Sequence, residues 1–170
     1  MVGLGACTTG GTSTLLNSPP LLLQVTATRG KFDLAEEYSV TDTTIEAGDV
    51  VRLAQLTTSN NQQTTIEKTD KGYDSSILGI ISTDPGITLS STVELNSYQE
   101  KPNLRPVALQ GRVPVKVTNE NGPIRRGDIL TSSATLPGYA MKATRAGRSI
   151  GTAMEDLYCL EGFLCEGKVM

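Results

Sequence analysis

The chain has 170 residues and a formal net charge of −3, a size that fits one domain, or one domain with an arm. It contains no histidine, so a Ser-His-Asp or Cys-His catalytic centre within the chain is excluded. It also has no block of basic residues and no apolar run approaching the roughly 20 residues that cross a membrane. We therefore expect no nucleic-acid partner and no membrane span.

Residues 1–31 are rich in Thr, Gly and Ser and contain Pro19-Pro20. Within them, Leu21–Val25 fits a strand, but nothing there indicates a core. We interpret residues 1–31 as an N-terminal arm that packs on a neighbouring chain or on the end of a preceding stalk. A disordered leader is the alternative. Residues 32–170 are predicted to form one β-rich domain.

An acidic cluster with the sequence F-D-L-A-E-E-Y occupies residues 32–38. Asp33 and Glu36 form a D-x-x-E pair within it. Two close carboxylates can divide the roles of acid and base, because each changes the pKa of the other. The cluster is therefore a candidate self-processing site, and the alternative is an acidic lead-in that orients the first strand.

From residue 45 onward, short apolar segments recur between turn residues such as Asn121-Gly122. No segment shows sustained helical periodicity with caps, so we predict an all-β fold. The core must be built from Val, Ile and Leu, because the chain has no Trp and only two Phe. The predicted strands are Val50–Leu56, Thr64–Thr69, Ile77–Ser82, Val107–Gln110, Val113–Thr118, Ile129–Thr131, Tyr139–Thr144, Ile150–Met154 and Phe163–Met170.

A weak internal repeat relates I-E-A-G-D-V-V at residues 45–51 to I-R-R-G-D-I-L at residues 124–130. Each copy is followed by a strand pair and then by an apolar segment that contains glycine. Glycine accepts a positive φ, and Asp can bond nearby backbone amides, so each Gly-Asp pair predicts a turn that leads into a buried strand. Two such units predict a small barrel or sandwich with two pseudo-repeated halves, and a chance match is the alternative.

The strongest strand pattern is Val107–Val117, which follows a polar loop over residues 90–104. Pro114 cannot donate to a sheet, so it predicts an edge strand or a bulge, with Gly111 as the bulged residue. The functional interpretation is an edge that pairs with another subunit. The alternative is a protected edge strand within one chain.

Few residues of the second half fit a ligand site. Glu120, at the tip of a polar turn, is either a distant active-site carboxylate or a solvent-exposed turn acid. The basic residues form either an anion site or a solvated charged surface, and they are Arg125, Arg126, Lys142, Arg145 and Arg148. The chain lacks a glycine-rich phosphate loop followed by Lys and a helix, and we expect no cofactor.

Cysteine spacing does not favour a zinc site, because none of the three cysteines forms a C-x-x-C pair. Cys159 and Cys165 flank five residues, and a hairpin there would place the two thiols opposite each other. A disulfide is then geometrically possible, and buried free thiols are the alternative.

The order and spacing of the motifs over residues 32–155 carry a family resemblance. These motifs are F-D-L-A-E, I-E-A-G-D-V-V, Y-D-S-S-I-L-G-I-I-S-T-D-P-G, V-A-L-Q-G-R-V-P-V-K-V, E-N-G-P-I-R-R-G-D-I-L-T-S-S, L-P-G-Y-A-M-K-A-T and I-G-T-A-M-E. The segment resembles the autoproteolytic intramolecular-chaperone domain at the C-terminus of phage neck-appendage and tail-spike proteins and of related bacterial surface proteins. The resemblance implies a β-rich, trimeric domain that aids assembly of the fibre preceding it.

Some members of that family cut themselves by glutamic-type chemistry before the Asp of a motif similar to S-D-x-A-E. Carried over to this chain, the resemblance implies a scissile bond between Phe32 and Asp33, with Asp33 and Glu36 as the acids. Asp33 can reach its own preceding carbonyl through a six-membered ring, and Glu36 can hold the proton that the leaving nitrogen needs. Phe32 departs from the family's Ser, so we expect cleavage to be absent or very slow.

The sequence therefore predicts a C-terminal trimerisation and intramolecular-chaperone domain of a fibre or surface appendage. Its expected partners are itself, as a homotrimer, and the preceding stalk, on a virion appendage or a cell surface. One alternative is an active autoprotease that cuts between Phe32 and Asp33. Another is a receptor- or carbohydrate-binding tip, which the scarcity of aromatic side chains disfavours.

Overall fold

The structure, a computed structural model, describes residues 24–27, 32–54, 65–90, 103–159 and 165–170. These residues form strands and loops without a helix, which confirms the predicted all-β fold. No helix in this part of the chain is long and apolar enough to cross a membrane. The strands are β1 (Gln24–Ala27), β2 (Asp33–Val40), β3 (Val50–Leu53), β4 (Thr65–Lys68), β5 (Ile77–Ile81), β6 (Ile87–Ser90), β7 (Leu104–Gly111), β8 (Val115–Thr118), β9 (Ile129–Ser132), β10 (Ala140–Lys142), β11 (Gly151–Thr152) and β12 (Glu166–Val169).

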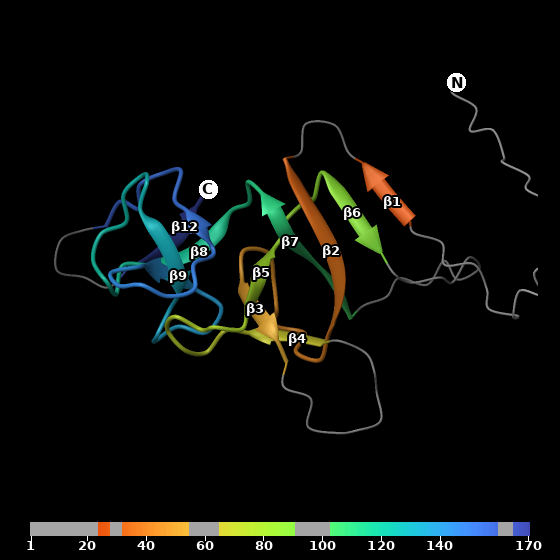
Figure 1. Cartoon of the computed structure of the whole chain (residues 1–170), viewed down its shortest axis with the longest axis horizontal. Helices are drawn as coiled ribbons and strands as arrows, with labels where there is room; N and C mark the ends of the chain where they lie inside the picture. Colours follow the sequence, from red (N-terminus) through yellow and green to blue (C-terminus); the bar gives the residue numbers. More distant parts are fainter. Residues whose placement is uncertain (1–23, 28–31, 55–64, 91–102, 160–164) are drawn as a thin grey trace, which may run out of the picture.

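The first half of the chain forms a small closed barrel. Its strands are hydrogen-bonded in the order β2-β4-β3-β5-β7, and β7 pairs again with β2 to close the ring (Figure 1). One end of β2 leaves the barrel wall, where Leu34 lies beside Ile87 of β6 in a parallel pair. β1 then adds to the outer side of β6, so β6 and β1 form a flap on the barrel.

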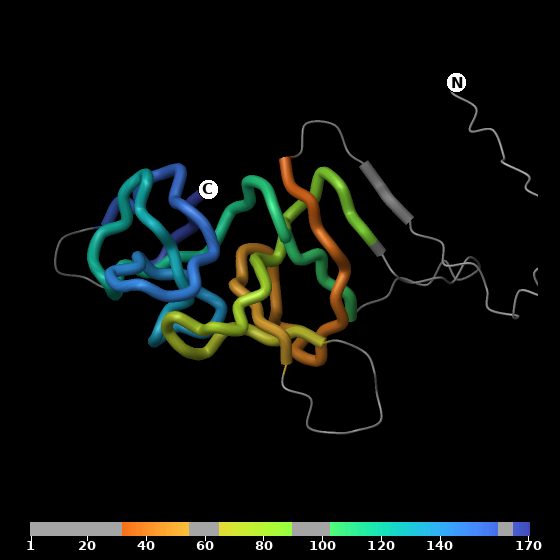
Figure 2. Tube along the Cα trace, in the orientation of Figure 1, coloured from red at the N-terminus to blue at the C-terminus, as the bar shows by residue number. Residues whose placement is uncertain are grey.

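The second half repeats this order without closing the ring. Its strands follow the order β12-β8-β10-β9-β11, in which β8, β10, β9, β11 and β12 correspond to β2, β4, β3, β5 and β7. The parallel pair β8–β10 matches the parallel pair β2–β4, and the other matched pairs are antiparallel in both halves. Figure 2 follows the chain from the first half, in orange to green, into the second, in cyan to blue.

The two Gly-Asp turns have the same geometry, which confirms the repeat suggested by the sequence. Gly48 and Gly127 adopt φ values of +94° and +92°, a region that L side chains rarely enter. Asp49 and Asp128 each accept a hydrogen bond from the backbone amide three residues earlier, at 2.9 and 2.8 Å. Each glycine amide also donates across the half, to Ile81 and Ala153 at 2.9 and 2.8 Å.

Two hydrophobic cores account for the two halves and for their union. The first barrel is filled by buried Val40, Ile45, Val51, Ile66, Ile81 and Val107. The second core combines side chains of both halves, because Val50 and Ile77 from the outside of the barrel pack with Val115, Val117, Ile124, Leu130, Ala140, Ala153 and Val169. The halves therefore share a core and form one unit.

The structure confirms the two strands predicted within residues 107–118 and corrects their expected place at a sheet edge. They are β7 and β8, separated by residues 112–114, and each strand has hydrogen-bonded neighbours on both sides. The prediction of an edge strand there was wrong, because the pairing partners lie far away in the sequence. The bulge lies at Leu109, since Ala108 and Gln110 pair with the consecutive residues Ala35 and Leu34, rather than at Gly111.

Predictions for residues 1–23 and for most of the loop at 90–104 lie outside the described residues. The expected strand Leu21–Val25 overlaps β1, which begins at Gln24.

Candidate functional site

Asp33 is the first residue of β2, and its carboxylate is held by the turn between β5 and β6. It is 8% exposed, although a charged side chain usually remains in water. The hydroxyl of Ser82 donates to Asp33 Oδ2 at 2.6 Å, and the amide of Gly86 donates to Asp33 Oδ1 at 3.0 Å. Ser82 follows β5 and Gly86 precedes β6, so the S-T-D-P-G turn between these strands supplies both donors. These hydrogen bonds offset the cost of burying the carboxylate.

The Phe32–Asp33 peptide bond is itself closely held. The Phe32 carbonyl accepts a hydrogen bond from the Arg112 amide at 3.1 Å. Gly111 adopts a φ of +131°, and a Cβ there would overlap the Phe32 carbonyl oxygen and the Asp33 backbone. The Phe32 ring is 62% exposed, and the Arg112 guanidinium lies 4.1 Å from its centroid. Backbone and side chain of Arg112 therefore fix the orientation of this peptide bond.

Glu36 lies on the opposite face of β2 from Asp33, because successive side chains of a strand alternate. It shares its face with Tyr38, whose hydroxyl donates to Glu36 Oε2 at 2.8 Å. Burial, together with this hydrogen bond and the nearby charge of Glu36, raises the pKa of Tyr38 to about 12. Glu36 thus has a stable hydrogen-bond donor on the side of the strand that packs on the barrel core.

The arrangement has a hydrogen-bond donor on the carbonyl, as an acyl-transfer site does. It lacks a contact between the two acids. The donor on the Phe32 carbonyl resembles part of an oxyanion hole, since it would stabilise negative charge developing on that oxygen. No described hydrogen bond joins Asp33 to Glu36, and strand alternation directs the two carboxylates apart. In this conformation each acid binds its own donors, so a shared proton between them is not part of the observed geometry.

Sequence reasoning named Asp33 and Glu36 but missed the residues that surround the peptide bond. Ser82, Gly86 and Arg112 contact Asp33 or Phe32 only because β6 and β7 pair with β2. The D-P-G sequence at residues 84–86 is typical of a turn. No local pattern indicates its contact with Asp33, which lies 53 residues earlier.

A second polar cluster lies where the two halves meet. Asp49 is fully buried, and its carboxylate is 2.6 Å from Lys116 Nζ and 3.2 Å from Lys68 Nζ. Lys116 Nζ also lies 2.6 Å from Glu46, whose side chain is mostly exposed. The backbones of the two halves also meet here, because the Lys116 amide donates to the Gly48 carbonyl at 3.0 Å. The charges are mutually compensated, and we interpret the cluster as a polar link between the halves.

Three of the five basic residues considered for an anion site have partners within the described part of the chain. Lys142 Nζ lies 2.9 Å from Asp128, and the Arg145 guanidinium lies 4.1 Å from the centroid of the Tyr73 ring. Arg148 donates to the Ile77 carbonyl at 3.1 Å. Glu120 accepts a hydrogen bond from the Ala134 amide at 2.6 Å, which fixes a turn. These contacts assign structural roles to Lys142, Arg145, Arg148 and Glu120.

The chain forms the disulfide that the cysteine spacing allows. Cys159 and Cys165 are bonded, with their Cα atoms 6.1 Å apart. The Cys165 amide donates to the Asn119 side chain at 2.8 Å, which ties the bridge to the turn after β8. Within the described residues, no three His, Cys, Asp or Glu side chains gather in a way that could hold a metal ion.

Comparison of the chain with protein-family models, with curated proteins and with solved structures gives no match.

Proposed function

We propose that this chain is an assembly domain, which trimerises and thereby aligns and helps to fold the fibre or stalk segment that precedes it. One observation supports the proposal best. Exposed apolar side chains surround the start of β2, the point where the chain enters the domain from the N-terminal arm. We call this group the entry patch, and it consists of Phe32, Ile87 and Leu109, which are 62%, 40% and 44% exposed.

The entry patch is built by strand pairing between distant segments. Ile87 flanks β2 from β6, in register with Leu34, and Leu109 is the extra residue of the bulge on the other side. Exposed apolar groups that gather in this way typically mark contacts with another protein. Contacts between copies at this point would bring the preceding segments of the chains together, which is the physical requirement for aligning a fibre.

Light scattering coupled to size exclusion tests the assembly. The expected mass at micromolar concentration is three times the 18.0 kDa of one chain. Leu109→Asp should lower this mass, because it places a charge in the proposed contact. Leu53→Asp is the matched control, since Leu53 is 43% exposed and lies outside the entry patch. A wild-type mass of one chain, or equal effects of both variants, would contradict the proposal.

Self-cleavage between Phe32 and Asp33 is the second candidate function. The hydrogen bond from the Arg112 amide to the Phe32 carbonyl favours it, because this donor would stabilise the charge that develops when the bond is attacked. The separate hydrogen bonds of Asp33 and Glu36 oppose it, so we propose assembly as the main function. The mass of the purified chain distinguishes an active autoprotease from an intact assembly domain.

A further inference from the structure

The five barrel strands of the first half each have a counterpart in the second half, but the junction that would close the second barrel differs. In the first half, the Ser82 amide donates to the Pro106 carbonyl at 2.8 Å, and in the second, the Met154 amide donates to the Met170 carbonyl at 2.6 Å. Beyond Pro106, β7 continues along β5, pairing Val107 with Ile81. No described strand continues the equivalent path along β11, which is the last strand of its sheet.

Two equivalent glycines show that a strand in the position of β7 needs a neighbour without a side chain. Gly79 of β5 and Gly151 of β11 correspond, because each lies opposite the second residue of its matched strand, Val51 or Leu130. A Cβ on Gly79 would lie 2.5 Å from the Ala108 carbonyl oxygen and 2.8 Å from a Val107 methyl, so the close approach of β7 needs glycine there. A Cβ on Gly151 would meet nothing within 4 Å.

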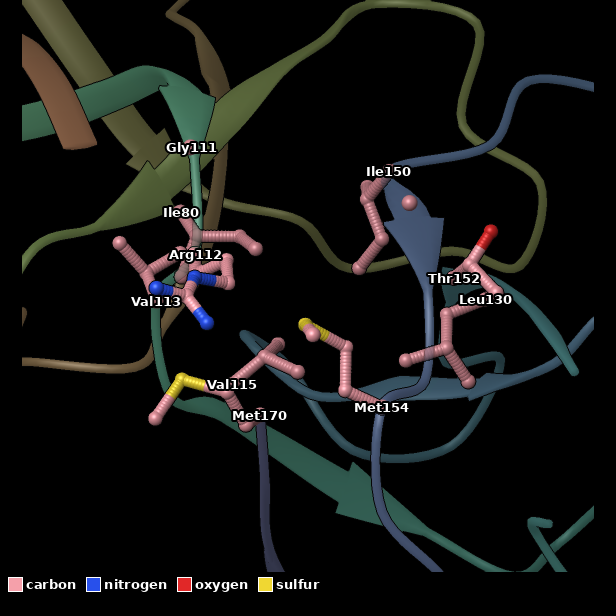
Figure 3. A pocket seen from close by; sticks show the side chains of 11 residues that line it. Ile80, Gly111, Arg112, Val113, Val115, Leu130, Ile150, Thr152, Met154 and Met170 are labelled. Atoms are coloured by element: carbon pink, nitrogen blue, oxygen red, sulfur yellow. The ribbon is translucent and has the colours of Figure 1, made fainter. Parts of the chain in front are cut away.

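The space beside Gly151 is a cavity of about 80 Å³. Apolar side chains of both halves point into it, with the Met154 thioether near its centre, and Arg112 and Thr152 add polar groups to the lining (Figure 3). In the first half, the equivalent space is filled by Val107, which is completely buried. We call this cavity the β11 groove, and its lining includes Ile80, Val113, Val115, Leu130, Ile150 and Met154.

We propose that the β11 groove binds an extended strand of another polypeptide, antiparallel to β11 and in the position that β7 occupies in the first half. The backbone of this strand adds to the sheet, as in β-strand addition at other sheet edges. An apolar side chain of the size of Val enters the cavity, and a small residue follows it opposite Gly151. The inference is independent of the entry patch, because it rests on the internal repeat.

The test uses an acetylated synthetic peptide with the sequence of residues 107–113, the segment that fills the equivalent groove. In titrations of the isotope-labelled full chain, followed by amide chemical shifts, we expect saturable changes centred on Gly151, Thr152 and Met154. A peptide with Gly in place of its first Val should bind at least about tenfold more weakly, because no side chain then fills the cavity. Absence of saturable shifts at millimolar peptide would overturn the proposal.

Two pairs of variants locate the binding. Gly151→Ala should weaken binding at least about tenfold, by the crowding seen at Gly79, whereas Gly122→Ala should not. Gly122 is the matched control, since it also has a positive φ and open space around it. Met154→Lys should weaken binding and Leu53→Lys should not, although the two side chains are 41% and 43% exposed. Equal effects within either pair would overturn the proposal, and circular dichroism establishes that each variant is folded.

Discussion

Lys116 forms an ion pair between the two repeated halves. It lies on β8 of the second half, and its ammonium contacts Asp49 in the first Gly-Asp turn. The matching turn of the second half has a different arrangement. Its Asp128 pairs with Lys142, which is partly exposed. Equivalent aspartates thus share a backbone role, while only Asp49 also joins the halves.

We expect Lys116→Met to reduce the free energy of unfolding by about 3 kcal/mol, because removing one partner leaves the other charge poorly compensated in the interior. Urea denaturation measures the change. Lys142→Met is the matched control and should cost about 0.5 kcal/mol, since its ion pair is closer to solvent. Equal costs would mean that the Lys116 contact adds nothing to the union of the halves.

The same ion pair predicts an alkaline dependence of stability. Burial alone would lower the pKa of Lys116, but its hydrogen bonds to Asp49 and Glu46 outweigh burial and raise the pKa above the ordinary 10.5. A raised pKa in the folded state gives stability that is complete below pH 10.5 and is lost as the pH rises through the folded value. The difference between wild type and Lys116→Met should therefore be constant at neutral pH and shrink only in strong alkali.

The prediction about self-cleavage depends on the contacts of Phe32 and Asp33. The Asp33 carboxylate is held by Ser82 and Gly86, and Glu36 lies on the other face of β2. Attack on the Phe32 carbonyl would require Asp33 to leave both donors, and misplacement of a reacting group by about 1 Å can cost roughly a hundredfold in rate. Purified protein should keep its full-length mass after days at neutral pH.

Mass spectrometry of the intact chain checks this prediction. If Phe32→Ser produces cleavage, the reaction should depend on Asp33 and Glu36. A fragment of the wild-type chain that begins at Asp33, and that disappears in Asp33→Asn or Glu36→Gln, would make the autoprotease the better proposal. Ser82→Ala is an informative companion, because it removes one donor from Asp33 without changing either acid.

At the scale of the elements, most strands after residue 45 could be predicted from the sequence, whereas β2 and β6 could not. β3, β5 and β9 are apolar segments bounded by turns, so local pattern sufficed. β2 contains D-L-A-E-E-Y, in which acids occupy both faces of the strand. It forms a strand because Ser82 and Gly86 compensate Asp33 and Tyr38 binds Glu36, and the contacts to Asp33 come from distant residues. For the same reason, the sequence identified the acids of the candidate site but not their partners.

The disulfide joins Cys159 to Cys165, just before β12, and closes a short covalent ring in the chain. We expect its reduction, or the double change of Cys159 and Cys165 to Ser, to lower the free energy of unfolding by about 2 kcal/mol, the value for a short closed loop. Thermal denaturation with and without reductant measures the loss. Since the double Ser variant has no disulfide, reductant should not change its stability. An effect of reductant on that variant would show that the loss has another cause.

At the scale of the whole molecule, the shared core predicts cooperative unfolding. Val50 and Ile77 of the first half pack with Val117 and Leu130 of the second, so neither half can unfold without exposing the core of the other. Calorimetry should give one transition, in which the calorimetric and van't Hoff enthalpies agree for each cooperative unit. Two separate transitions would mean that the halves are independent domains.

The repeat could be recognised from two Gly-Asp turns, because a positive φ and a capping carboxylate require particular residues at particular positions. Closure of the first barrel and the open edge of the second could not be recognised from the sequence. They depend on the path of β7 and β12, and the sequence pattern of residues 107–117 favoured an edge strand. Such features depend on strand-pairing partners that are distant in the sequence. A local sequence pattern does not indicate these partners.

Closure of the first barrel by β7 has a consequence for biosynthesis. β2 is made early, but its long neighbour in the ring, in which Leu104 pairs with Ser39, is translated much later. Until that segment leaves the ribosome, nascent β2 has an unpaired edge, and the strands already made cannot enclose their apolar side chains. Neighbouring ribosomes on one messenger would then present several such edges close together, at the stage when mispairing competes most strongly with folding.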